Sequence, residues 1–161
     1  LKAGDPAPMF GPVKLHNPAE AGMPTFTLGK LVGEEPEDPN AKAVLVTFFA
    51  TWCGPCKKEL PFLVELHGKY KDKGLRIVSV SIDKEEEAFK QVKALVAEHK
   101  VAFPVVMDRF NLLARRYLGE KTAMPSVFLV KRDGSIVMTK QGYDGDAAAF
   151  LTAEIEKAIG G

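Results

Sequence analysis

The clearest hydrophobic pattern in the chain is a run of apolar, β-branched and aromatic residues from Val44 to Ala50. The run has no alternation of polar and apolar positions, which is typical of a strand buried on both faces. It ends near a Cys-Gly-Pro-Cys turn, and apolar positions at helical spacing then continue to about Tyr70. Pro61 interrupts that spacing, so we expect a kink there. The pattern predicts a buried strand that passes through a two-cysteine turn into a helix.

The pattern after residue 74 predicts alternating strands and helices. Asp83 and Glu86 have the spacing of a capping box, so we expect them to begin a helix. The Lys-Arg-Asp-Gly sequence at 131–134 has the composition of a hairpin turn. We expect strands over 75–82, 103–107, 126–130 and 135–140, and helices after 83, over 110–118 and over 146–159. The order β-α-β-α-β-α-β-β-α indicates an α/β fold.

The first part of the chain has a different character. Residues 1–40 are dense in proline and glycine, and their only regular elements are a short predicted strand over 25–28 and a turn over 29–33. The sequence contains no internal repeat. We therefore expect a single domain over 1–161, with an N-terminal extension over 1–40 and a core over 41–161.

Composition narrows the classes of function. The chain has 161 residues, of which 46% are hydrophobic and 27% charged, and its formal net charge is +1. This balance gives no electrostatic reason to expect binding to nucleic acid. The chain also has no apolar stretch near the roughly 20 residues that span a bilayer. Leu1 does not begin the charged-then-apolar pattern of a signal peptide, as expected if a targeting segment has been removed.

The two cysteines carry the candidate chemistry. Pro55 suits the first turn of a helix, which places Cys53 at the helix N-terminus. Unpaired N–H groups and the helix dipole stabilise an anion there, so we expect the pKa of the Cys53 thiol to fall from about 8.5 towards roughly 7. Cys56 lies one turn further in and would resolve a mixed disulfide. A closed zinc site needs four ligands, and no histidine lies at ligand spacing, so we expect no metal.

The segment around these cysteines resembles a known family. Residues 49–57, Phe-Ala-Thr-Trp-Cys-Gly-Pro-Cys-Lys, resemble the active-site segment of the thioredoxin superfamily. The longer segment to Pro61 is similar to the thiol–disulfide oxidoreductases of the TlpA/ResA type, and residues 4–10 resemble an opening that these proteins share with peroxiredoxins. The resemblance covers nearly the whole chain and is weakest over 11–43. It implies a thioredoxin fold, which is a mixed central sheet flanked by helices, with an N-terminal extension.

The resemblance also implies a substrate-binding surface. The segment from Thr122 to Ser126 precedes a predicted strand, where thioredoxin-like proteins place a cis-proline against the active-site disulfide. Pro125 would be that residue, and Met124 would offer its backbone to a bound substrate strand. Trp52, Gly54 and Pro55 would complete the surface. The alternatives are a trans proline that merely begins a strand and a tryptophan that belongs to the core.

Glu59 is the candidate proton acceptor. It lies three residues after Cys56, so the two side chains are neighbours on a helix, and burial beside the apolar stripe would raise the pKa of its carboxyl group. The family assigns a glutamate at this position to proton transfer. Ordinary thioredoxins use a buried aspartate in the preceding strand, where this chain has Thr47. The alternative is a solvated glutamate paired with a nearby lysine: Lys57, Lys58 or Lys69.

The resemblance implies a thiol–disulfide oxidoreductase that uses the Cys53–Cys56 redox-active disulfide and needs no other cofactor. Its expected substrates are protein disulfides in the periplasm or elsewhere outside the cytoplasm, and one known duty of the family is cytochrome c maturation. We expect a monomer, supplied with electrons by a membrane thiol donor and anchored through a removed N-terminal segment. A cytoplasmic location stays open, because a closely spaced cysteine pair is compatible with either compartment.

Two other functions are alternatives. A peroxiredoxin-like peroxidase requires a threonine three positions before its reactive cysteine, whereas Thr51 is separated from Cys53 only by Trp52. A copper-binding or other metal-binding thioredoxin-like module uses a wider cysteine spacing and a partner histidine, and the sequence shows neither.

Overall fold

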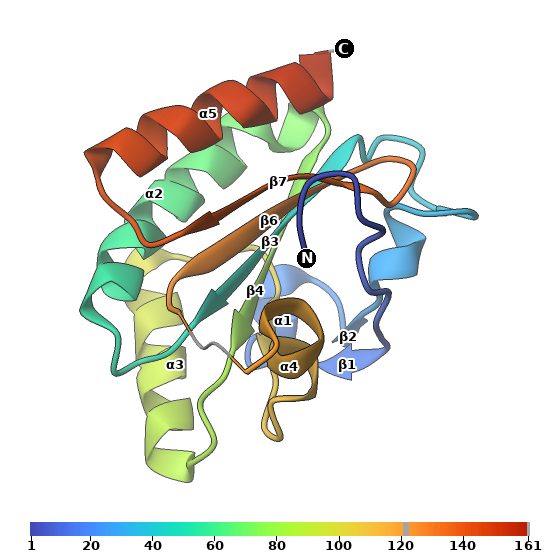
Figure 1. Cartoon of the computed structure of the whole chain (residues 1–161). Coiled ribbons are helices and arrows are strands. Elements are labelled where there is room, and N and C mark those ends of the chain that lie inside the picture. The colour runs from blue at the N-terminus through green and yellow to red at the C-terminus, as the bar shows by residue number, and fades with distance from the viewer. Residues whose placement is uncertain (121–122, 161) are drawn as a thin grey trace.

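A central five-stranded sheet organises the chain. The computed structural model describes residues 1–120 and 123–160. The strand order is β5-β4-β3-β6-β7, with β4 parallel to β3 and β5, while β6 is antiparallel to β3 and β7. The sheet is therefore mixed, as expected (Figure 1). The strands are β3 (Ala43–Phe49), β4 (Leu75–Ser81), β5 (Val105–Met107), β6 (Ser126–Lys131) and β7 (Ile136–Gln141).

Helices cover both faces of this sheet (Figure 1). They are α2 (Gly54–Tyr70), α3 (Glu86–His99), α4 (Leu112–Leu118) and α5 (Gly145–Gly160). Buried side chains of α2, α3 and α5 pack on one face, and those of α4 pack on the other together with the N-terminal extension. The helix α2 continues through Pro61. From residue 41 onwards, the element order predicted from the sequence is confirmed.

The central strand β3 contributes side chains to both sides of the core. Val44, Val46 and Phe48 belong to the cluster under α4, whereas Leu45 belongs to the cluster under α2 and α5. All four are fully buried, and burying a side chain of this kind stabilises the fold by about 1.5–3 kcal/mol. Because β3 is packed on both faces, its end is held firmly in place, and so is the start of the segment that leads to Cys53.

The N-terminal extension has more structure than the sequence predicted. It contains β1 (Val13–Lys14), α1 (Pro18–Ala21) and β2 (Thr25–Phe26), and β1 pairs antiparallel with β2. The strand expected over 25–28 is thus two residues long, because a 3₁₀ turn follows at Leu28–Lys30. A two-residue strand shows no periodicity, which is why β1 left no signal in the hydrophobic pattern.

The extension also closes the two edges of the sheet. Pro6 forms a β-bridge with Ser135 beside β7, and Leu15 forms one with Val106 in β5. Phe10 of the extension belongs to the same buried cluster as the residues of β3. Covering the edge strands hides backbone groups that would otherwise pair with other chains. The extension and the core therefore share one hydrophobic interior.

Candidate active site

Cys53 lies at the N-terminus of α2, as the sequence predicted. It is the N-cap residue, with extended backbone angles (φ −98°, ψ 112°), and its Sγ accepts a hydrogen bond from the backbone N–H of Cys56 at 3.3 Å. Pro55 lies within the first turn of the helix. The two cysteines form a disulfide. The sulfur of Cys53 is therefore placed where the helix supplies a free N–H group and the positive end of its dipole.

A buried carboxylate fixes the bend before Cys53. The carboxylate of Asp83 accepts hydrogen bonds from the backbone N–H of Thr51 (3.1 Å), the Thr51 hydroxyl (2.7 Å) and the Ser81 hydroxyl (2.7 Å). These bonds tie the end of β3 to the end of β4. The predicted capping box of Asp83 and Glu86 is wrong: α3 begins at Glu86 with Glu85 as its N-cap and no side-chain cap.

This cross-strand role of Asp83 was missed because it depends on the pairing of β3 with β4. A signal was present, since an aspartate directly after a buried strand lies at the carboxyl edge of the sheet, where loops carry function. The threonine that Asp83 binds lies two positions before Cys53. Asp83 therefore holds the backbone that leads to Cys53, and it takes no part in the disulfide exchange itself.

The residues around the disulfide differ sharply in exposure. Both cysteines are buried, with 6% of Cys53 and 4% of Cys56 exposed, whereas Gly54 and Pro55 are exposed. Trp52 is 69% exposed, so the alternative of a core tryptophan is wrong. It lines a hollow of about 470 Å³ with residues of the β4–α3 loop and of the loop after β5. Trp52, Gly54 and Pro55 thus form an accessible surface beside the cysteines.

Pro125 lies at the same end of the sheet. The Met124–Pro125 peptide bond is cis, as the sequence predicted. The register of β6 against β3, in which Ser126 pairs with Phe48, brings Pro125 to the carboxyl end of β3. Pro125 is buried, and Met124 packs against the cluster that contains both cysteines. Thr122 lies outside the described residues.

Glu59 is buried in the first part of α2. Only 2% of it is exposed, and among the described residues its carboxyl group forms no ion pair. The alternative of a solvated glutamate paired with a lysine is therefore wrong. Burial raises the pKa of Glu59 from its ordinary 4.5 to about 8. The pKa of Tyr143 is raised chiefly by burial and secondarily by the charge of Glu59.

Thr47 occupies the position where an ordinary thioredoxin has its aspartate. It is buried in β3, and its hydroxyl donates a hydrogen bond to the Ser79 hydroxyl of β4 at 2.9 Å. The hydroxyl groups of Thr47 and Ser79 are both neutral. Glu59, on the first turns of α2, is instead a buried carboxyl group that can accept a proton. Because Thr47 carries no charge, this position cannot supply the proton acceptor.

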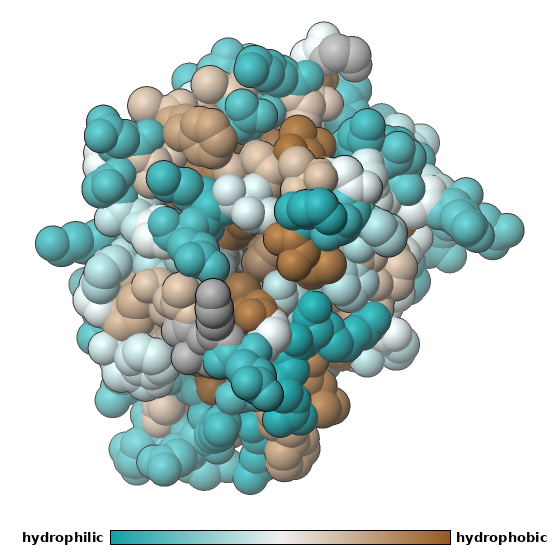
Figure 2. Space-filling model, in the orientation of Figure 1, coloured by the Kyte–Doolittle hydropathy of each residue, from teal (hydrophilic) through white to brown (hydrophobic). Residues whose placement is uncertain are grey.

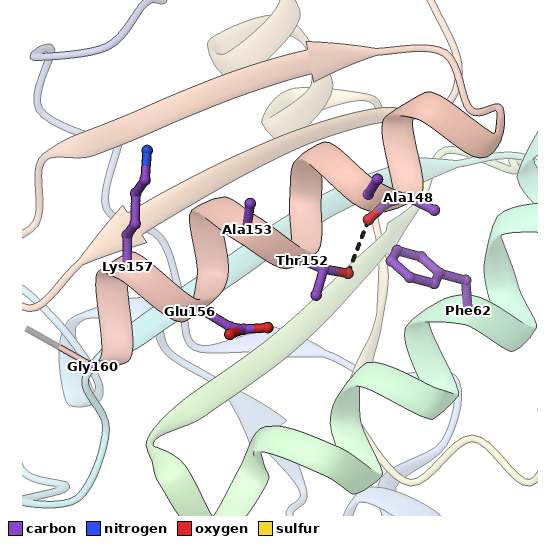
Figure 3. A pocket seen from close by; sticks show the side chains of 8 residues that line it. Phe62, Ala148, Thr152, Ala153, Glu156, Lys157 and Gly160 are labelled. Atoms are coloured by element: carbon purple, nitrogen blue, oxygen red, sulfur yellow. Dashed lines mark hydrogen bonds between the residues drawn. The ribbon is translucent and has the colours of Figure 1, made fainter.

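A hollow larger than the one beside Trp52 lies between α2 and α5 (Figure 3). It measures about 970 Å³ and is lined mostly by small side chains of α5 and by Phe62 of α2. Its charged residues are Glu156, which accepts a hydrogen bond from the Tyr70 hydroxyl at 2.8 Å, and Lys157. It contains no redox-active or nucleophilic pair, so its size does not make it the active site.

Two of the histidines pack against phenylalanine rings. His16 packs against Phe89 with 5.2 Å between ring centroids, and His67 packs against Phe103 at 5.8 Å. In the part of the chain that the structure describes, no three histidine, cysteine, aspartate or glutamate residues are grouped as a metal site would require. Nor is any helix over 1–120 and 123–160 long and apolar enough to cross a membrane.

Comparison with known proteins agrees with this geometry. Residues 20–139 match the AhpC/TSA family. The chain belongs to the AhpC/TSA family. The thiol-disulfide oxidoreductase ResA of Bacillus cereus is 36% identical to this chain over 130 residues, which is 76% of this chain and 72% of that protein. ResA of Geobacillus kaustophilus is 30% identical over 129 residues, covering 75% of this chain and 71% of that protein.

Solved structures share the fold of this AhpC/TSA-family chain. The thioredoxin domain of a thiol-disulfide oxidoreductase from Bacteroides vulgatus superimposes with a TM-score of 0.72 at 26% identity and covers 99% of both chains. StoA of Bacillus subtilis gives a TM-score of 0.67 at 24% identity over 93% of this chain and 98% of that one. The thioredoxin fold, the resemblance to ResA-type proteins and the thiol–disulfide oxidoreductase class are confirmed.

Proposed function

We propose that this protein reduces disulfide bonds in other proteins by exchange through Cys53 and Cys56. The observation that carries the proposal is the position of the Cys53–Cys56 disulfide at the N-terminus of α2, beside an exposed surface. A sulfur in that position is favoured as a thiolate, which is the attacking species in disulfide exchange. The ResA relatives support the same class of reaction.

The reaction consists of two exchanges. The Cys53 thiolate attacks one sulfur of the target disulfide, so that an S–S bond to Cys53 forms as the target bond breaks, and the leaving sulfur takes up a proton. The Cys56 thiolate then attacks the Cys53 sulfur and releases the second target sulfur. Two electrons pass from the protein to the target, and the protein is left with the Cys53–Cys56 disulfide.

Glu59 is the residue that we assign to the second exchange. Cys56 must lose its proton before it attacks, and Glu59 lies three positions further along the same helix. A pKa of about 8 for Glu59 is close to the value of about 8.5 for an ordinary thiol, so proton transfer between the two groups costs little. Burial, which raises the pKa of Glu59, is thus the feature that suits it to this role.

The surface around the cysteines is assigned to the substrate backbone. Among the described residues, the backbone N–H and C=O of Met124 form no hydrogen bond, and a substrate strand could pair with them. Trp52, Gly54 and Pro55 present exposed area on the other side of the buried sulfurs. We therefore assign catalysis to Cys53, Cys56 and Glu59, together with Pro125, which holds the Met124 backbone at the carboxyl end of β3.

The cellular setting follows the resemblance to TlpA/ResA-type proteins. We place the protein outside the cytoplasm, held there by an N-terminal anchor, with a membrane thiol donor restoring the dithiol. Cytochrome c maturation is the duty that this setting favours, and the active unit is the monomer. A reduction potential near −270 mV, as in thioredoxin, fits this reducing role, whereas one near −120 mV fits an oxidant.

A disulfide-reduction assay tests the proposal. Insulin serves as substrate with dithiothreitol as the reductant. We expect turnover by the native protein and none by Cys53→Ser. Reduced Cys56→Ser, mixed with insulin after the dithiothreitol has been removed, should instead accumulate a mixed disulfide, which gel electrophoresis without reductant would detect. Turnover by Cys53→Ser equal to that of the native protein would refute the proposed attack.

The peroxidase alternative finds no support in the site. The hydroxyl of Thr51 donates to the buried Asp83 carboxylate at 2.7 Å, so its proton is already used inside the fold. We therefore expect no peroxide turnover by the reduced protein.

A further inference from the structure

Several exposed apolar side chains line two hollows of the surface. In the part of the chain that the structure describes, six large hydrophobic residues are exposed, and four of them line two hollows to which the loop after β5 contributes. Trp52 lines the first hollow, and Met9, Phe110 and Leu112 line the second. Phe110 is 70% exposed and Leu112 57%. Side chains left this open usually mark a contact surface when they cluster.

The second hollow, which we call the cationic hollow, combines this apolar surface with positive charge. It measures about 550 Å³ and is formed by the N-terminal extension, the loop after β5 and α4. Its charged residues are Lys14, Arg109, Arg116 and Asp108. The Asp108 carboxylate is buried and accepts hydrogen bonds from the N–H groups of Leu113 and Ala114 at 3.1 and 2.9 Å. That carboxylate is therefore occupied inside the fold and does not face a ligand.

The three cations of the hollow have no such partners. Lys14, Arg109 and Arg116 are exposed, and none forms an ion pair among the described residues. The Arg109 guanidinium lies 6.0 Å from the ring centroids of both Phe89 and Phe110, which places positive charge directly against the exposed ring. Figure 2 shows hydrophilic and hydrophobic side chains side by side over the region of α4.

The loop after β5 contributes residues to both the cationic hollow and the hollow that Trp52 lines. Asn111 belongs to the loop that forms the hollow, and together with Trp52 it lines the first hollow beside Cys53. The amide oxygen of Asn111, Oδ1, is buried and has no hydrogen-bond partner among the described residues. A protein whose disulfide reaches Cys53 would therefore extend across Trp52 and Asn111 towards Phe110.

We propose that the cationic hollow binds the substrate protein beside its disulfide, at a segment that carries an apolar side chain flanked by carboxylates. This proposal rests on the proposed function and names the substrate class for it. The apolar side chain would pack on Phe110 and Leu112, and the carboxylates would pair with Arg109, Arg116 and Lys14. The loop that lines both hollows favours the substrate protein over a bilayer, because a bilayer on this face would block access to the sulfur of Cys53.

Disulfide-containing peptides provide the probe. One short peptide carries an intramolecular disulfide followed by a flexible spacer and a Glu-Leu-Glu-Phe-Asp tail, and a matched peptide has lysine in place of each acidic residue. Dipyridyl disulfide, a small and strongly oxidising disulfide, reports the reactivity of the dithiol without a tail. Each reaction transfers two electrons from the reduced protein to the probe, which gains two protons while Cys53 and Cys56 form a disulfide. The ratio of peptide rate to small-disulfide rate is the readout.

We expect the native protein to reduce the acidic peptide at least about fivefold faster than the lysine peptide at low salt. The reason is that several exposed ion pairs form with the acidic peptide only. The preference should shrink as the Debye length falls from about 30 Å at 0.01 M to about 8 Å at 0.15 M ionic strength. Phe110→Ser and Arg116→Glu should each lower the ratio for the acidic peptide. Equal rates for the two peptides would overturn the proposal.

Matched variants separate the hollow from general charge and exposure. Arg115→Glu makes the same charge change one residue away, but Arg115 does not line the hollow. Phe150→Ser removes an exposed ring from α5, which lies on the opposite face of the sheet. Both should retain the native ratio. An equal loss in Arg115→Glu and Arg116→Glu would overturn the proposal, because it would show a long-range charge effect.

Three results distinguish the remaining explanations. If the protein sediments with phosphatidylglycerol vesicles and Phe110→Ser abolishes this, the hollow is a membrane contact and the proposal fails. If the reduced native protein reacts with no disulfide at all, the proposed function fails and takes this proposal with it. Reaction with dipyridyl disulfide without any preference between the two peptides refutes the docking proposal alone.

Discussion

Replacing Glu59 with glutamine tests how burial sets the properties of the active site. In the folded protein the pKa of Glu59 is about 8, whereas its ordinary value is 4.5. One pKa unit corresponds to about 1.4 kcal/mol, so the difference of 3.5 units amounts to about 5 kcal/mol. The folded state prefers the protonated carboxyl group. Its contribution to stability is therefore fully present below pH 4.5 and is lost as the pH rises to about 8.

Glutamine keeps the shape of the side chain but cannot ionise. The Glu59→Gln protein should therefore lose less stability than the native protein as the pH rises. We expect the difference in free energy of unfolding between variant and native protein to grow by up to about 5 kcal/mol from pH 4.5 to pH 9, and most of the rise should occur below pH 8. Guanidinium chloride unfolding of both oxidised proteins at several pH values measures it.

The same variant should slow the release of a mixed disulfide between the protein and insulin, because Cys56 loses its proton acceptor. Glu65→Gln is a matched control, since Glu65 is exposed on the same helix. A stability difference that does not change with pH would refute the reasoning, because Glu59 would then ionise at its ordinary pKa. Unchanged release of the mixed disulfide would refute its assigned role.

Three further predictions concern buried polar groups. Burial lowers the pKa of His16 from 6.5 to about 4, so the native protein should lose up to about 3 kcal/mol of stability as the pH falls from 6.5 to 4. His16→Leu should not show this loss, and an identical pH profile would contradict the account. Thr51→Val removes a donor from the buried Asp83 carboxylate and should cost about 1–3 kcal/mol in a urea titration; a cost below about 0.5 kcal/mol would contradict it. Asn17→Ala removes two buried hydrogen bonds, at 2.9 and 2.8 Å, and should lower the unfolding free energy by about 2–4 kcal/mol, whereas an unchanged thermal midpoint would argue against their importance.

Local signals were enough to predict the centre of the fold. The run that became β3, the turn at Cys53 and the helix α2 are adjacent in the sequence, so hydrophobic periodicity and turn chemistry located them. The burial of Glu59 also followed from its place beside the apolar positions of α2. These features depend on neighbours within a few residues, which is the range that a sequence pattern can report.

Features that depend on distant parts of the chain could not be predicted. The bond between Thr51 and Asp83 requires the parallel register of β3 and β4, which the sequence does not state. The cationic hollow joins Lys14 to Arg116 across about a hundred residues of sequence, and only the folded chain brings them together. Trp52 could be assigned either to the core or to the surface from its neighbours alone, and its exposure decides the question.

The most direct test of the account is the pKa of the Cys53 thiol in the reduced protein. The rate of alkylation by iodoacetamide, measured against pH in the Cys56→Ser variant, follows the thiolate of Cys53 alone. We expect a pKa near 7, because the N-terminus of α2 stabilises the thiolate. A pKa at or above the ordinary value of about 8.5 would contradict the central claim that the helix activates this sulfur.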